Sequence, residues 1–163
     1  MSLYNYRLSI EIYRWSFLRL LNSLSEYFYR SKLFNNNSMK KQILIVDDKQ
    51  SLSALVAQFL HQNFEVITKK NGMEAMLWLQ DSHLPDLIIT DLEMPKMDGL
   101  ELIKRIKESG FFAEIPVMVL SCKNTSKDRI ECLKAGATDY MVKPFNPEEL
   151  LIRLENILQK SIA

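Results

Sequence analysis

The sequence is poor in the residues that build disulfide frameworks and transition-metal sites. It contains two cysteines, Cys122 and Cys132, and two histidines, His61 and His83. Two cysteines form neither a disulfide framework nor a zinc-binding pattern, and the histidines share no motif. We therefore expect the histidines at the surface or at helix ends, and the low cysteine content indicates a reducing, cytoplasmic setting.

Long apolar runs and a strong net charge are also missing. No apolar run reaches the ~18 residues of a membrane span, and the N-terminus lacks the compact apolar block and small-residue cleavage site of a signal peptide. The formal net charge of the 163 residues is only +1, so no overall field attracts nucleic acid. We expect no direct binding to DNA.

Residues 1–38 differ from the rest of the chain in charge and pattern. They contain five Lys or Arg residues and two acids. Apolar residues recur at alternating spacings of three and four across residues 8–30, which is typical of an amphipathic helix. Three interpretations stay open: a helix that packs on the domain or pairs with a second copy in a homodimer, contact with a membrane surface, or a segment outside the functional protein, which would then start at Met39.

Residues 39–163 are predicted to form one domain of alternating strands and helices. Short apolar runs predict strands at 43–46, 64–67, 87–90, 117–120 and 140–142, and apolar residues at helical spacing predict a helix after each strand. Continuously apolar strands are typical of a parallel sheet with helices on both faces. The sequence therefore predicts an α/β fold with a doubly wound, five-stranded parallel sheet.

The helix predicted at 126–135 differs from the others because it is mostly polar. Between Lys123 and Lys134 the apolar residues are Ile130, Cys132 and Leu133. A helix with so little apolar surface to bury is held weakly. We expect this helix to be available for movement or for binding.

Polar residues stand at the ends of four predicted strands: Asp47 and Asp48 after the first, Asp91 after the third, Ser121 after the fourth and Lys143 after the fifth. An isolated acid after a strand is usually a turn former or a helix cap. In an open parallel sheet, however, the carboxyl ends of the strands share one edge, and ligands bind outside that edge. Five such residues from four strands predict a functional site there.

The residue types at this edge indicate a particular chemistry. Three neighbouring carboxylates repel one another and can stay ionised when they share a cation. A ligand set of oxygen atoms without Cys or His suits Mg²⁺, while Lys143 supplies a positive charge for an anion and Ser121 a hydrogen-bond donor. We infer phosphoryl transfer to or from a carboxylate, with Asp91, from the most central strand, as the nucleophile.

Several sequence segments occur here in a characteristic order and spacing. They are ILIVDD at 43–48, DLEMPKMDG at 91–99, Leu120-Ser121, and the stretch from Ala135-Gly136-Ala137 through Asp139-Tyr140 to Lys143-Pro144-Phe145. With these segments, residues 41–160 closely resemble the receiver domain of two-component response regulators. The resemblance implies a flavodoxin-like fold with strand order 2-1-3-4-5 and a cis peptide bond before Pro144.

The resemblance also implies a role for each residue of the predicted site. Asp91 would accept a phosphoryl group from a sensor histidine kinase or a histidine phosphotransfer protein. Mg²⁺ would be bound by Asp47, Asp48, Asp91 and the backbone carbonyl of Glu93. Ser121 would be the switch hydroxyl, Tyr140 the switch aromatic residue and Lys143 the phosphate-binding lysine.

Two side chains near Asp91 are expected to modulate it. Cys122 stands where the family usually has a very small residue, so we expect it to slow access to Asp91. Glu93 adds a negative charge, which is expected to disfavour the approach of an anionic phosphodonor. Asp98 gains no partner from other strands, and we predict that it is a helix cap before Gly99.

These observations favour a signalling switch over an enzyme, with at most self-phosphorylation and autodephosphorylation. Because the sequence ends at Ala163, we expect no output domain. We expect the domain instead to bind a downstream protein through the helix at 126–135, the last strand and the last helix, or to pass the phosphoryl group onward. Two alternatives remain. One is a Mg²⁺-dependent phosphatase with an aspartyl-phosphate intermediate, in which Glu93 has the offset of a general acid; the other is a phosphate-independent scaffold assembled through residues 1–38.

Overall fold

A computed structural model of the chain describes residues 40–160. Its elements are β1 (Gln42–Val46), α2 (Gln50–Leu60), β2 (Glu65–Lys69), α3 (Gly72–Gln80), β3 (Leu87–Thr90), α4 (Gly99–Glu108), β4 (Val117–Ser121), α5 (Ser126–Lys134), β5 (Asp139–Val142) and α6 (Pro147–Lys160). The predicted amphipathic helix across residues 8–30 lies outside the described residues.

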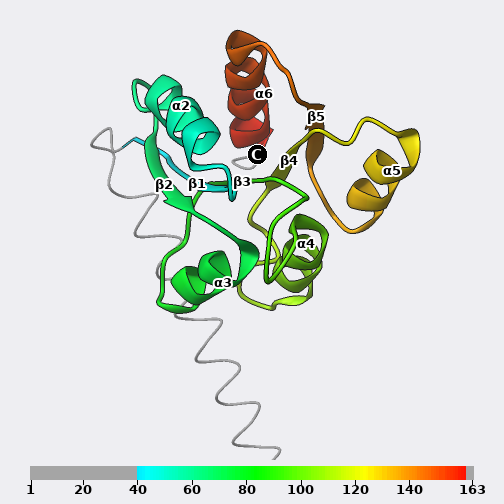
Figure 1. Cartoon of the computed structure of the whole chain (residues 1–163). Helices are drawn as coiled ribbons and strands as arrows, with labels where there is room; N and C mark the ends of the chain where they lie inside the picture. Colours follow the sequence, from blue (N-terminus) through cyan, green and yellow to red (C-terminus); the bar gives the residue numbers. More distant parts are fainter. Residues whose placement is uncertain (1–39, 161–163) are drawn as a thin grey trace, which may run out of the picture. The chain divides into compact units, whose positions relative to one another are not determined.

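The strands within residues 40–160 form one parallel sheet, in the order β2-β1-β3-β4-β5 (Figure 1). Both the alternation of strands and helices and the strand order confirm the predicted doubly wound fold. β2 continues to Lys69, two residues beyond the predicted apolar run, because its backbone pairing with β1 extends through polar residues. The Lys143–Pro144 peptide bond is cis, as expected.

Helices cover both faces of the sheet (Figure 1), and a layer of apolar side chains lies on each side of it. Side chains of β1 alternate between the two layers: Ile43 and Ile45 pack with α2 and α6, whereas Leu44 and Val46 pack with α3, α4 and α5. Side chains of successive strand residues point to opposite faces, so a continuously apolar strand supplies both layers. The apolar runs of the sequence therefore reflect burial on two sides.

The helices α3, α4 and α5 each begin with a side-chain cap that fixes where the preceding loop ends. The side chains of Asn71, Asp98 and Thr125 each accept a hydrogen bond from the backbone N–H three residues on, at the starts of α3, α4 and α5. Such caps satisfy a donor that the helix leaves unpaired. The prediction that Asp98 is a helix cap is confirmed.

α5 is anchored to the domain by a small part of its surface. Of its nine residues, Cys132 is the one that is buried, while Ile130 and Leu133 are about half exposed. Burial raises the pKa of the Cys132 thiol, which keeps it neutral. The attachment of α5 therefore depends strongly on one small side chain.

Replacing that side chain by a polar one should loosen α5. Cys132→Ser places a hydroxyl in the apolar layer, and burial of a hydroxyl without a good partner costs about 1–3 kcal/mol. We expect a loss of that size in urea unfolding, together with faster amide hydrogen exchange in α5. The control is Cys122→Ser, which changes an exposed thiol; equal effects of the two changes would contradict the anchoring role of Cys132.

Candidate functional site

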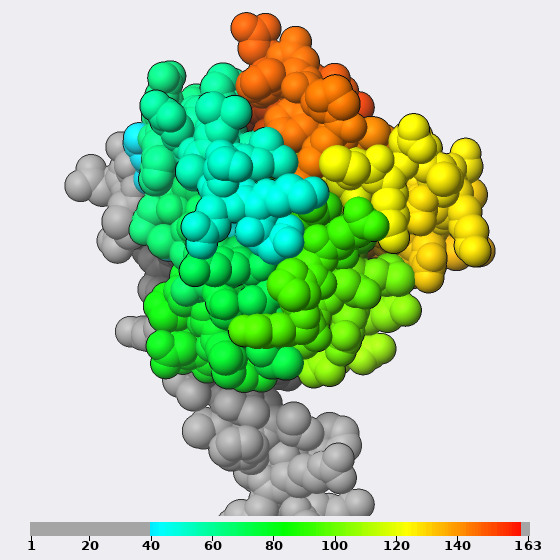
Figure 2. Space-filling model, in the orientation of Figure 1, coloured from blue at the N-terminus to red at the C-terminus, as the bar shows by residue number. Residues whose placement is uncertain are grey.

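The carboxyl edge of the sheet holds the predicted acids through the sheet's own hydrogen bonds. The backbone N–H of Asp47 donates to Lys69 O (3.0 Å), and that of Asp91 donates to Val46 O (2.9 Å). Both acids are thus in register with the neighbouring strand although they stand beyond the strand ends. Figure 2 shows this face, where the segments after β1, β3, β4 and β5 meet (cyan, green, yellow and orange).

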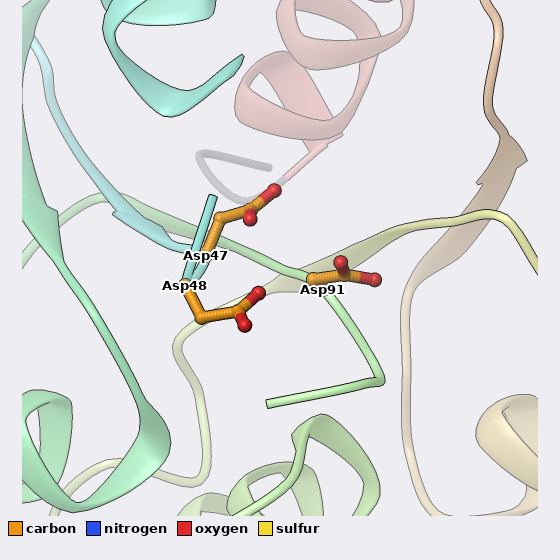
Figure 3. Close-up of side chains that lie close together, drawn as sticks. All are labelled: Asp47, Asp48 and Asp91. Atoms are coloured by element: carbon orange, nitrogen blue, oxygen red, sulfur yellow. The ribbon is translucent and has the colours of Figure 1, made fainter. Parts of the chain in front are cut away.

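Three carboxylates converge at this edge. One oxygen atom each of Asp47, Asp48 and Asp91 lies within 4.8 Å of the others, and Figure 3 shows these side chains side by side. Asp47 and Asp91 are buried, with 6% and 3% of their surfaces exposed, whereas Asp48 is exposed. The structure therefore brings together the three predicted acids, in an acidic pocket that can hold a metal ion.

Lys143 is the cation of this pocket. Its Nζ lies 2.7 Å from Asp47 Oδ2 and 3.2 Å from Asp91 Oδ2, and the side chain is 7% exposed. The backbone N–H of Lys143 donates to Ser121 O at 2.9 Å, which fixes the start of the lysine relative to β4. One positive charge thus faces two buried negative charges, and the third carboxylate, Asp48, lies beside them.

The backbone around Asp91 leaves no room for a side chain at Gly99. A Cβ atom there would lie 2.0 Å from Asp91 O. The Thr90 hydroxyl donates to the same oxygen (2.8 Å), and Gly99 N–H donates to Leu92 O (3.0 Å). The sequence indicated no site role for Thr90 or Gly99, because this close approach exists only in the folded chain.

Ser121 and Tyr140 are linked through one residue, Lys123. Ser121 is fully buried, and its Oγ accepts from Lys123 N–H at 3.3 Å. The Tyr140 hydroxyl donates to Lys123 O at 2.7 Å, and the ring is 6% exposed. Burial raises the pKa of the Tyr140 phenol. The guanidinium of Arg129, on α5, lies 5.8 Å from the centre of the ring, a distance at which a cation is attracted to an aromatic face.

The sequence carried no signal for the roles of Lys123 and Arg129. Both are exposed charged residues of a polar segment, and such residues usually face solvent. The structure also places the Lys123 ammonium 3.7 Å from the Glu93 carboxylate, with about half of each side chain exposed. The negative charge of Glu93 is thereby partly offset, which the sequence did not predict.

Comparison with known proteins agrees with this geometry. A family model described as the response regulator receiver domain matches residues 43–155, more than half of the chain. The chain therefore belongs to the response regulator receiver domain family of two-component systems. Among the described residues, no helix is both long and apolar enough to cross a membrane.

Relatives in this family carry the domain in different settings. The chain is 38% identical to the alkaline phosphatase synthesis transcriptional regulatory protein PhoP of Bacillus subtilis, over 76% of this chain and 50% of that protein. It is also 38% identical to the sensor histidine kinase TmoS of Ectopseudomonas mendocina, over 77% of this chain and 13% of TmoS. The chain thus spans half or less of these two relatives.

Solved structures share the fold as well. The chemotaxis response regulator CheY4 of Vibrio cholerae is 33% identical, with a TM-score of 0.68, and the match covers 73% of this chain and 99% of that chain. This similarity agrees with the flavodoxin-like architecture and the strand order of the described residues.

Removing the charge of Lys143 should destabilise the domain. Lys143→Met leaves Asp47 and Asp91 buried without their cation, and removal of one member of a buried ion pair costs about 3 kcal/mol or more. We expect a loss of this size in the free energy of unfolding, measured in urea at neutral pH. Lys104→Met, which changes an exposed lysine of α4, should have almost no effect; similar losses in both variants would show that the pocket does not need its lysine.

Proposed function

We propose that this receiver domain accepts a phosphoryl group on Asp91 from a histidine kinase or a histidine phosphotransfer protein. The observation that supports this proposal best is the position of Asp91. It is a buried carboxylate at the carboxyl end of the central strand, 3.2 Å from the Lys143 ammonium and beside Asp47 and Asp48. The proposed acceptor carboxylate is therefore adjacent to the cation that would offset the negative charge of the incoming phosphoryl group.

The proposed reaction is a transfer between two proteins. An oxygen of the Asp91 carboxylate forms a bond to phosphorus, and the bond from phosphorus to the donor imidazole nitrogen breaks, with its electron pair staying on that nitrogen. Lys143, already within 3.2 Å of the acceptor carboxylate, offsets charge on the phosphoryl oxygens. Positioning and charge neutralisation are the main requirements of such transfers.

The acidic pocket fits Mg²⁺ as the further cation. Its donor atoms are carboxylate oxygens of Asp47, Asp48 and Asp91, and oxygen ligands without sulfur or imidazole suit this metal. The backbone carbonyl of Glu93 would be a further ligand. When bound, Mg²⁺ supplies charge neutralisation for the phosphoryl group.

A change at Asp91 would reach α5 through the contacts of Ser121, Lys123 and Tyr140. Phosphorylation adds about −1.5 to −2 charge and three acceptor oxygens, and the buried Ser121 hydroxyl is the donor proposed to turn toward them. Its present contact with Lys123 N–H and the contact of Tyr140 with Lys123 O would then shift together. The surface of α5, β5 and α6 is the proposed site for a downstream protein. Cys132 is the one buried residue of α5, so this helix can shift more easily than the others.

The domain is proposed to act as a switch and not as a phosphatase. A phosphatase of the aspartyl-phosphate type needs a general acid next to the nucleophile. Glu93 has the required offset in sequence, but its carboxylate is paired with the Lys123 ammonium at 3.7 Å. Self-phosphorylation from small phosphodonors and autodephosphorylation remain within the proposal.

The central test is covalent labelling of Asp91. The protein is incubated with Mg²⁺ and acetyl phosphate, and its intact mass is measured. We expect the wild type to gain one phosphoryl group and Asp91→Asn to gain none, because the amide cannot act as the acceptor. Labelling should also stop when EDTA removes Mg²⁺.

The matched control is Asp98→Asn, an acid of the same loop. Asp98 caps α4, and Asn is an equally good cap, so this variant should fold and become labelled normally. If the wild type gains no phosphoryl group, or if Asp91→Asn is labelled as well, the proposed acceptor is wrong. Turnover of small phosphomonoesters would favour the phosphatase instead.

The ion pair between Glu93 and Lys123 should tune the labelling rate. Opposite or like charges near a surface interact by about 1 kcal/mol or more, so Glu93→Gln should speed labelling by acetyl phosphate about fivefold. Lys123→Gln should slow it by a similar factor, and both effects should shrink at high salt. Rates that stay unchanged in both variants at low salt would exclude a charge effect of this pair.

A further inference from the structure

The start of α3 is packed tightly against the loop that follows Asp91. Gly72, the first residue of α3, donates its backbone N–H to Met97 O at 3.1 Å. A Cβ atom on Gly72 would lie 2.7 Å from Met97 Cγ and 2.9 Å from its Sδ. The Met97 side chain is 1% exposed, so it has little free space into which it can move.

The backbone conformation does not explain this glycine. Gly72 does not lie in the left-handed region, where Gly136 has a φ of 103°, and alanine is a better helix former than glycine. A glycine at this position is therefore explained by the approach of Met97.

The position of Gly72 is itself fixed by the cap of α3. Asn71 is 3% exposed, its side chain accepts from Glu74 N–H, and its Nδ2 donates to Glu74 Oε1. Glu74 also accepts from Lys70 N–H, and this backbone hydrogen bond lowers the pKa of the Glu74 carboxyl. These contacts hold the first turn of α3, and with it the N–H of Gly72.

Met97 belongs to a loop that carries Asp91 at one end and Gly99 at the other. Gly99 touches Asp91 O, so the two ends of the loop meet. Between them, Lys96 has a φ of 68° and Met97 N–H donates to Pro95 O at 2.8 Å. A residue other than glycine in this conformation needs support from its surroundings, and the next residue, Met97, is the one that contacts α3.

We propose that Gly72 is a positioning residue for the phosphoacceptor loop: its missing side chain lets Met97 seat against α3, which holds residues 92–98 in the conformation that places Asp91. The consequence for labelling rests on the proposed function, whereas the contact itself does not. Gly72 acts through Met97 and is not proposed to touch the phosphoryl group.

The test is a double-mutant cycle with two measurements. Gly72→Ala, Met97→Ala and the double variant are compared with the wild type by hydrogen exchange of residues 92–98 and by the rate of labelling with acetyl phosphate. Gly110→Ala is the control, because a Cβ there meets no described atom within 4 Å. Circular dichroism melting reports whether each variant is folded.

We expect Gly72→Ala to speed hydrogen exchange of residues 92–98 and to slow labelling, each by roughly threefold or more, while Gly110→Ala changes neither. In the Met97→Ala background the contacts with Cγ and Sδ are gone, and only the contact of the new Cβ with Met97 O at 3.0 Å remains. Adding Gly72→Ala should therefore change less than it does in the wild type, and the two effects should be less than additive. If Gly72→Ala fails to fold, a double variant that behaves like Met97→Ala gives the same support.

Any of several results would overturn the proposal. They are wild-type exchange and labelling in Gly72→Ala, additive effects in the double variant, or loss of folding in both Gly72→Ala and the double variant. Faster exchange with unchanged labelling would refute the positioning role. A wild type that cannot be labelled would refute the proposed function, and the exchange cycle alone would then decide the contact between Gly72 and Met97.

Discussion

The mutual repulsion of Asp47, Asp48 and Asp91 is the constraint on which the arrangement of this domain depends. Two of these carboxylates are buried, and ions are costly to remove from water unless they are paired. Lys143 supplies that pairing from the far end of the sequence, at 2.7 and 3.2 Å. The pocket can therefore exist only if β1, β3 and β5 end at the same edge of the sheet.

The strand order meets this requirement. β1 and β3 are neighbours, so their final acids lie side by side, and β4 stands between β3 and β5 and brings Ser121 next to Lys143. The loop after β3 must then turn within a few residues to begin α4. The absence of a side chain at Gly99 makes that turn possible. In our proposal, the absence of a side chain at Gly72 likewise leaves room for Met97 to pack against α3.

Much of this was predictable from local pattern. Apolar runs such as 43–46 mark strands buried on both faces, and their ends point to Asp47, Asp91 and Lys143. What local pattern missed are pairings between distant loops. Lys123 looked like a solvent-facing lysine, yet its backbone joins Ser121 to Tyr140 and its ammonium faces Glu93. No periodicity predicts such contacts, because they depend on how loops from β3, β4 and β5 converge.

The sequence by itself determined the fold class and the chemical types at the site, because burial of apolar runs and the placement of polar residues at strand ends are read along the chain. The tertiary structure decided the distances. It brought Lys143 between two carboxylates, buried Tyr140 beneath Arg129, and pressed Gly72 and Gly99 against Met97 and Asp91. Those contacts join residues from different helices, strands and loops, and close packing in three dimensions sets them.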